Sequence, residues 1–99
     1  MAGVEFLPGV YEDLQRVISH LERHESGHVQ ERLGELVSAC DVLTDNPLIG
    51  RTTRGDMREL VIGSGSRGYV ARYRYVAALD TVFVMGVRAQ REAGYARDD

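Results

Sequence analysis

The chain has 99 residues, of which 43% are hydrophobic and 27% charged, as in an ordinary globular protein. We therefore expect a single domain over residues 1–99 with one core. No apolar run reaches the roughly 20 residues that span a bilayer, and the N-terminus lacks a signal pattern, so we expect a cytoplasmic protein without a membrane partner. Cys40 is the only cysteine, which excludes an internal disulfide and favours core packing over catalysis.

The net charge of −3 conceals a difference between the two halves of the chain. Residues 1–50 carry three arginines against nine acidic residues, whereas residues 51–91 carry eight arginines against three. Lysine is absent, which coding bias explains as well as a need for guanidinium groups does. The clustered arginines predict a basic face that meets phosphates or acidic side chains.

The chain begins with an apolar run at residues 4–7, which predicts an edge strand, and Pro8-Gly9 predicts a turn after it. Apolar residues then recur at helical spacing from Val10 to Leu21, and Glu12 and Asp13 are expected in the first turn of that helix.

A second helical pattern follows a break at residues 24–28. It runs from Val29 to Leu43 and ends at Asn46-Pro47. Because the connection is short, we expect the two helices to form an antiparallel hairpin.

The second half predicts a basic irregular loop at residues 48–56 and then three strands. The first strand covers residues 57–63 and is joined to Tyr69–Val76 by a glycine-rich turn. In this second strand, Tyr69, Ala71, Tyr73 and Tyr75 should face one way, and Val70, Arg72, Arg74 and Val76 the other.

The third strand covers residues 81–87 and is apolar enough to be central, and a polar tail occupies residues 88–99. The order strand, helix, helix, strand, strand, strand predicts an α+β fold. The N-terminal strand and an antiparallel helical hairpin precede a three-stranded antiparallel meander. One face of the sheet should stay open to a partner or substrate.

Strong signatures of common enzyme classes are absent, including phosphate-binding loops, zinc motifs and nucleophile elbows. Residues 63–68 are glycine-rich but lead into a strand, so a hairpin turn is favoured over a phosphate cradle. His20, His24 and His28 recur every four residues, yet Gly27 should interrupt their helix, which favours solvated histidines over a metal site. We expect neither a metal nor a cofactor.

The last third carries three ordered motifs. They are Arg58-Glu59-Leu60-Val61-Ile62, then Arg67 to Tyr75 with its repeated tyrosines, then the apolar run from Val82 that ends in Arg88, Arg91 and Tyr95. Together with Tyr11-Glu12-Asp13-Leu14 and the segment Asn46-Pro47-Leu48-Ile49-Gly50-Arg51, they resemble the RelE/ParE family of toxins from toxin-antitoxin systems. The resemblance covers nearly the whole chain.

For the RelE branch, the resemblance implies cleavage of messenger RNA in the ribosome, with cationic side chains stabilising the transition state and a C-terminal tyrosine near the scissile bond. The catalytic candidates are then Arg91 and Tyr95, with Arg88 and Arg58. Several of the family's cationic positions fall on other residues here: its strand lysines fall on Glu59 to Ile62, and two of its arginines fall on Val70 and Ala89.

For the ParE branch, the resemblance implies a toxin that binds and poisons DNA gyrase, and we favour this branch. Arg51, Arg54, Arg72 and Arg74 are the candidate partner-binding residues. A purely structural interpretation of the strand Tyr69–Val76 is simpler: its tyrosines pack in the core and on the sheet, and Arg72 and Arg74 are solvated. An inactive relative that serves as an interaction or plasmid-stabilisation module is a third alternative.

The resemblance also implies a cognate antitoxin. Its C-terminal segment would bind as a helix in a groove and as a strand on a sheet edge. An acidic antitoxin would meet the basic second half of the chain.

Overall fold

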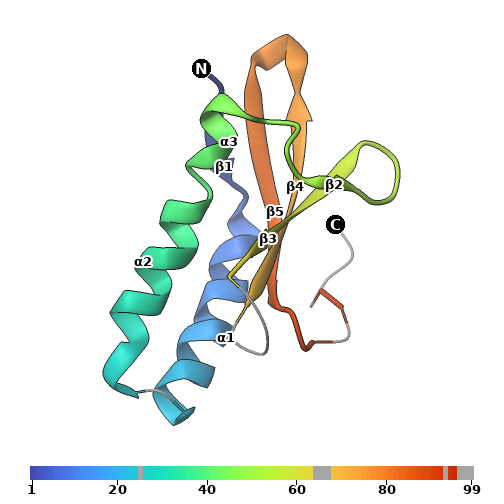
Figure 1. Ribbon diagram of the computed structural model, residues 1–99. Coiled ribbons are helices and arrows are strands. Elements are labelled where there is room, and N and C mark those ends of the chain that lie inside the picture. Colours follow the sequence, from blue (N-terminus) through green and yellow to red (C-terminus); the bar gives the residue numbers. More distant parts are fainter. Residues whose placement is uncertain (25, 64–67, 93, 96–99) are drawn as a thin grey trace.

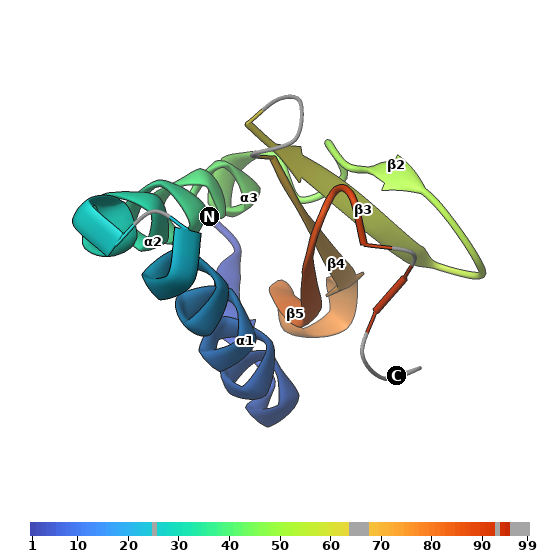
Figure 2. The same ribbon diagram turned by 90° about the horizontal axis from the view of Figure 1, so that it is seen from below.

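The computed structural model describes residues 1–24, 26–63, 68–92 and 94–95. The predicted glycine-rich turn therefore lies mostly outside the described residues. A five-stranded sheet carries two long helices on one side, and Figure 2 shows residues 90–92 and 94–95, which follow the last strand, on the other side. The predicted α+β class and the order of its main elements are confirmed.

The N-terminal strand β1 spans Gly3–Phe6, and helix α1 spans Pro8–His24. The predicted turn at Pro8-Gly9 was wrong, because the helix begins at Pro8 itself. Proline suits the first helical position, where its fixed φ is favourable and its missing N–H would have no partner in the helix.

The second helical region is divided, where the sequence predicted one helix. A short 3-10 helix, η1 (Ser26–His28), precedes α2 (Val29–Ala39), and α3 (Val42–Asp45) follows a turn. Cys40 lies in that turn and is fully buried, as predicted, and burial together with the charge of Asp41 raises its pKa to about 11. Figure 1 shows α1 and α2 side by side as an antiparallel pair.

The sheet has the strand order β1-β5-β4-β3-β2. β2 (Arg51–Thr52) is a short strand within the segment predicted to be irregular. β3 (Met57–Ile62), β4 (Tyr69–Val76) and β5 (Thr81–Ala89) form the antiparallel meander, and a 3-10 helix, η3 (Ala77–Leu79), joins the last two. β1 lies at the edge, as predicted, and runs parallel to β5, which is central.

The core lies between the helices and the sheet. Tyr73 and Ala71 are fully buried in it, and Tyr69 and Tyr75 pack against it, so the predicted facing of these residues is confirmed. Arg72 corrects the interpretation of a solvated face, because only 7% of this residue is exposed. The pairing register shifts between Arg72 and Tyr73, where β5 contains one additional residue, Met85.

Asp13 does not have the predicted role at the start of a helix. It lies in the second turn of α1 and is 1% exposed. One carboxylate oxygen accepts the backbone N–H of Val87 at 2.9 Å, and the other accepts a hydrogen bond from Arg16 at 3.1 Å. Arg16 also donates to the Val87 carbonyl at 3.2 Å. Because the pairing of β1 with β5 ends at Val84, these two helix side chains replace a strand partner at Val87.

The loop before β2 is fixed by a buried contact. The N–H of Gly50 donates to the hydroxyl of Tyr73 at 2.8 Å. A Cβ atom at Gly50 would lie 2.7 Å from the Tyr73 ring, so this close approach requires glycine. Arg58 donates to the carbonyls of Leu48 and Gly50, at 3.0 and 2.9 Å. In the described part of the chain, no helix is both long and apolar enough to cross a membrane.

Candidate functional site

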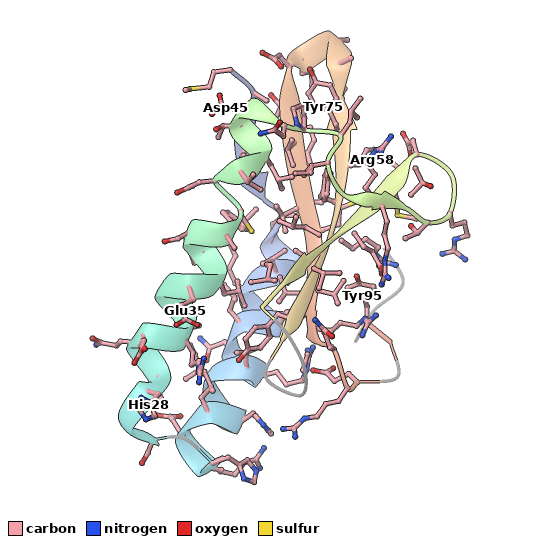
Figure 3. The ribbon with its side chains drawn as sticks, in the orientation of Figure 1. His28, Glu35, Asp45, Arg58, Tyr75 and Tyr95 are labelled. Carbon is pink, nitrogen blue, oxygen red and sulfur yellow. The ribbon has the colours of Figure 1, made fainter. Side chains whose placement is uncertain are left out.

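Tyr95, labelled in Figure 3, lies beyond the end of β5 and close to two arginines of the sheet. Its hydroxyl donates a 2.8 Å hydrogen bond to the carboxylate of Glu59. The guanidinium carbon of Arg72 lies 4.2 Å from the centre of its ring, and that of Arg88 lies 5.2 Å away. With Arg51, which binds the same carboxylate, these residues form what we call the tyrosine–arginine cluster.

Neighbouring strands bring this cluster together. Glu59 of β3 pairs in register with Arg72 of β4, and Arg72 pairs with Gly86 of β5. A Cβ atom at Gly86 would lie 3.1 Å from the Tyr95 ring, so the absence of a side chain there leaves room for the ring. The tyrosine therefore packs closely on the backbone of a central strand, between cationic groups.

Glu59 accepts hydrogen bonds from two sides. Besides Tyr95, the Nε and one terminal nitrogen of Arg51 donate to a single carboxylate oxygen at 3.2 and 3.0 Å. Burial acts to raise the pKa of Glu59, but the hydrogen bonds from Tyr95 and Arg51 and the charges of Arg51 and Arg88 lower it below its usual value. Glu59 is therefore ionised at neutral pH and holds the cluster together.

Tyr95 is held in its neutral form. Burial raises its pKa well above the ordinary value, and the hydrogen bond to Glu59 and the charge of that carboxylate raise it further. Arg88 and Arg72 act in the opposite direction but are outweighed. A phenol in this state is a weak proton acceptor at neutral pH, which makes Tyr95 poorly suited to act as a general base while it contacts Glu59.

Arg88 also fixes the chain that follows β5. One of its terminal nitrogens donates to the carbonyls of Ala89, Gln90 and Glu92 at 3.2 to 3.3 Å. The same guanidinium group lies near the Tyr95 ring. Arg88 thus links the path of the C-terminal segment to the tyrosine that this segment carries.

The other predicted site residues lie elsewhere. Arg58 holds the loop before β2, Arg74 pairs with Asp56 at 2.9 Å, and Arg54 is exposed in the turn between β2 and β3. Arg91 contacts His20 of α1 rather than the cluster. Of the catalytic candidates, the structure therefore brings Tyr95 and Arg88 together and separates Arg91 and Arg58 from them. Of the partner-binding candidates, Arg51 and Arg72 join that cluster.

Glu59 was not among the site residues predicted from the sequence. One signal for it was available, since Glu59 faces an arginine-rich segment and occupies a position where the resemblance implies a cation. The three histidines do not align on one helix, because α1 ends at His24 and His28 lies in η1. The described residues contain no group of three or more His, Cys, Asp or Glu side chains that could hold a metal ion.

Comparison with known proteins shows which family the sequence matches. The sequence model described as "ParE toxin of type II toxin-antitoxin system, parDE" matches residues 4–94. No curated protein sequence matches the chain. The fold is similar to a chain of the chromosomal ParDE toxin-antitoxin system from P. aeruginosa, with a TM-score of 0.75, 14% identity, and coverage of 90% of this chain and 96% of that one.

Two E. coli structures share the fold as well. A chain of the intact RelBE toxin-antitoxin complex has a TM-score of 0.59 and 19% identity, covering 93% of this chain and 100% of that one. The isolated RelE toxin has a TM-score of 0.57 and 19% identity, covering 94% of this chain and 89% of that one. The expected RelE/ParE-like fold is confirmed.

Proposed function

We propose a mode of action for this chain, which belongs to the ParE toxin family of type II toxin-antitoxin systems. The chain inhibits growth in the cytoplasm by binding and poisoning DNA gyrase, and a cognate antitoxin neutralises it. Recognition of a large enzyme requires a complementary surface and no catalytic group in the toxin.

The observation that carries this proposal is the hydrogen bond from Tyr95 to Glu59. In a toxin that cleaves RNA, a C-terminal tyrosine needs an accessible hydroxyl and cationic neighbours that stabilise the transition state. Here the hydroxyl of Tyr95 donates to the ionised carboxylate of Glu59, and that carboxylate also forms an ion pair with Arg51. This arrangement supports a binding surface over a reaction centre.

RNA cleavage at the ribosome is the second candidate, because one feature favours it. Arg72 and Arg88 both lie against the Tyr95 ring, and guanidinium groups stabilise the charge that develops on a phosphate under attack by a 2′-hydroxyl. If a substrate displaced Glu59 from Tyr95, these groups would surround the reacting phosphate.

Two assays with the purified chain distinguish the two candidate functions. In one the chain is added to gyrase with plasmid DNA, and in the other to ribosomes carrying a defined messenger RNA. We expect inhibition of supercoiling and accumulation of cleaved DNA, with intact RNA. Tyr95→Phe keeps the ring and removes the hydroxyl, so it should change gyrase inhibition by less than about threefold. A loss of RNA cleavage by orders of magnitude in this variant would instead establish the ribonuclease.

Arg91→Ala is the companion variant, since it removes a cation outside the tyrosine–arginine cluster. A gyrase-binding surface that extends to Arg91 should lose affinity in this variant while tolerating Tyr95→Phe. If neither gyrase nor RNA is affected by the unmodified chain, both candidates fail and an interaction module without toxicity remains.

The antitoxin should bind along β3 and α2. The register of β2 with β3 covers only Arg58 and Glu59, so among the described residues no strand lies outside Leu60–Ile62. A hollow of about 450 Å³ adjoins this edge, and its lining includes Leu36 and Ala39 of α2 and Ile62 of β3. The free edge of β3 can form hydrogen bonds with an added strand of the antitoxin. The partly apolar hollow beside it can accept a helix that precedes or follows that strand.

Co-expression with the neighbouring gene tests this binding surface. We expect a small acidic protein to co-purify, and Val61→Glu should weaken the complex, because Val61 is 47% exposed on the free part of β3. Leu79→Glu is the matched control, since Leu79 is 64% exposed in η3, away from that edge. Equal binding by both variants would place the antitoxin elsewhere.

A further inference from the structure

A pocket of about 240 Å³ lies between α1 and the end of β5, apart from the tyrosine–arginine cluster. Helix α1 contributes Arg16, His20 and Arg23 to its lining, and the chain after β5 contributes Arg91 and Glu92. The side chains of α1 lie at intervals of three or four residues and therefore share one face of the helix. Three guanidinium groups and an imidazole thus meet in one concave site.

The charges of this pocket are not balanced internally. Arg16 binds the carboxylates of Asp13 and Glu92, at 3.1 and 3.2 Å, so it offsets the only carboxylate in the lining. Within the described part of the chain, neither Arg23 nor Arg91 forms an ion pair with a carboxylate. Among the described residues, a ligand would therefore displace no carboxylate from Arg23 or Arg91.

The site is also partly ordered before any ligand binds. Arg91 donates a hydrogen bond to Nε2 of His20, and the His20 ring lies 4.6 Å from the ring of His24. This contact positions the Arg91 guanidinium at the rim of the pocket. Glu92, held by Arg16 and by the N–H of Ala89 at 3.1 Å, fixes the adjoining backbone.

We propose that this pocket binds a phosphate monoester. Guanidinium groups match the oxygens of a phosphate in paired hydrogen bonds, and two of them balance a dianion. The volume of about 240 Å³ is below the range typical of drug-sized ligands, so the pocket would hold the phosphate while the group attached to it extends beyond the pocket. The phosphate belongs either to a free small molecule or to the end of a nucleic acid strand. This inference does not rest on the proposed action on gyrase.

Titration of the full chain with adenosine monophosphate, followed by NMR of the backbone amides and by calorimetry, tests the site. We expect saturable one-to-one binding with the largest shifts at residues 16–24 and 89–92, and no binding of adenosine. Arg23→Gln and Arg91→Gln should each weaken binding at least about tenfold, since each removes a charged hydrogen-bond donor.

Arg54→Gln is the control for charge, because it removes one exposed arginine that does not line the pocket. It should change the affinity less than about threefold. Equal losses of affinity in all three variants would mean that only the net charge of the chain matters, and this would overturn the proposal. Equal binding of adenosine and adenosine monophosphate would overturn it as well. Absence of saturation at millimolar concentration would overturn it too.

Two further probes identify the source of the phosphate. Inorganic phosphate that competes with adenosine monophosphate at similar concentration indicates a small free ligand. A dinucleotide with a 5′-phosphate that binds at least about tenfold more tightly than either, and than the same dinucleotide without that phosphate, indicates the end of a strand. Either result supports the phosphate site.

Discussion

The side chains on the two faces of strand β4 are held by different kinds of interaction. On the face toward the helices, Tyr73 is fully buried and its hydroxyl accepts a hydrogen bond from Gly50. On the opposite face, Arg72 lies under the ring of Tyr95, whose hydroxyl donates to Glu59. Apolar burial dominates the first face and charge dominates the second, so substitutions should separate stability from binding.

The largest loss of stability should follow Tyr73→Ala. Removal of a fully buried aromatic side chain should lower the free energy of unfolding by about 3–5 kcal/mol. Urea denaturation followed by circular dichroism measures it. Tyr73→Phe is the matched control: it keeps the ring and leaves the N–H of Gly50 without its acceptor, which should cost about 1–3 kcal/mol. A loss below about 1 kcal/mol for Tyr73→Ala would contradict the account of this face.

The next effect should come from Asp13→Ala. This change leaves the buried N–H of Val87 without a partner and should cost about 2–3 kcal/mol. Asp13→Asn keeps an acceptor for that N–H, so it should cost less, and the same denaturation curves compare the two. If both variants were equally unstable, the charge opposite Arg16 would matter more than the backbone hydrogen bond.

The contrast between the two faces of β4 also explains which parts of the fold and of the site could be predicted from the sequence. Helical spacing and alternation predicted the core side of the fold, because apolar residues such as Leu21 and Tyr73 have one stable location. Asp13 and Glu59 looked like ordinary surface carboxylates, since their partners lie 74 and 36 positions away along the chain. The neighbouring residues do not identify these two distant partners, although the nearby arginines were a signal for Glu59. The approach of Tyr95 to Gly86 depends on the path of the chain after β5.

Tyr95→Phe should have a smaller effect on stability. The lost hydrogen bond to Glu59 is partly exposed to solvent, so the free energy of unfolding should fall by about 1 kcal/mol or less. The ring should stay between Arg72 and Arg88, which NMR shifts of the neighbouring backbone amides can verify. A fall of more than about 2 kcal/mol would mean that the cluster supports the fold as much as the core does.

The smallest effect should be the dependence of this cluster on pH. The folded pKa of Tyr95 is raised above the ordinary value of 10.0, so its contribution is present below that pH and is lost as the pH rises through the folded pKa. The folded pKa of Glu59 is lowered from 4.5, so its contribution is present above that pH and is lost as the pH falls through the folded pKa.

The contact between Tyr95 and Glu59 should therefore be most stable between about pH 5 and pH 10. Ultraviolet absorbance of the unmodified chain minus that of Tyr95→Phe isolates the ionisation of this phenol. We expect the difference to appear only above pH 10. Ionisation of Tyr95 near or below pH 10 would mean that Glu59 does not hold it.

Poisoning of DNA gyrase by this chain is best tested by expressing the chain alone from a tightly controlled promoter, with growth and a DNA-damage reporter followed together. We expect growth arrest with the reporter on, and rescue by the neighbouring antitoxin gene. Growth arrest with the reporter silent would contradict gyrase poisoning and favour RNA cleavage, and normal growth would contradict toxicity altogether.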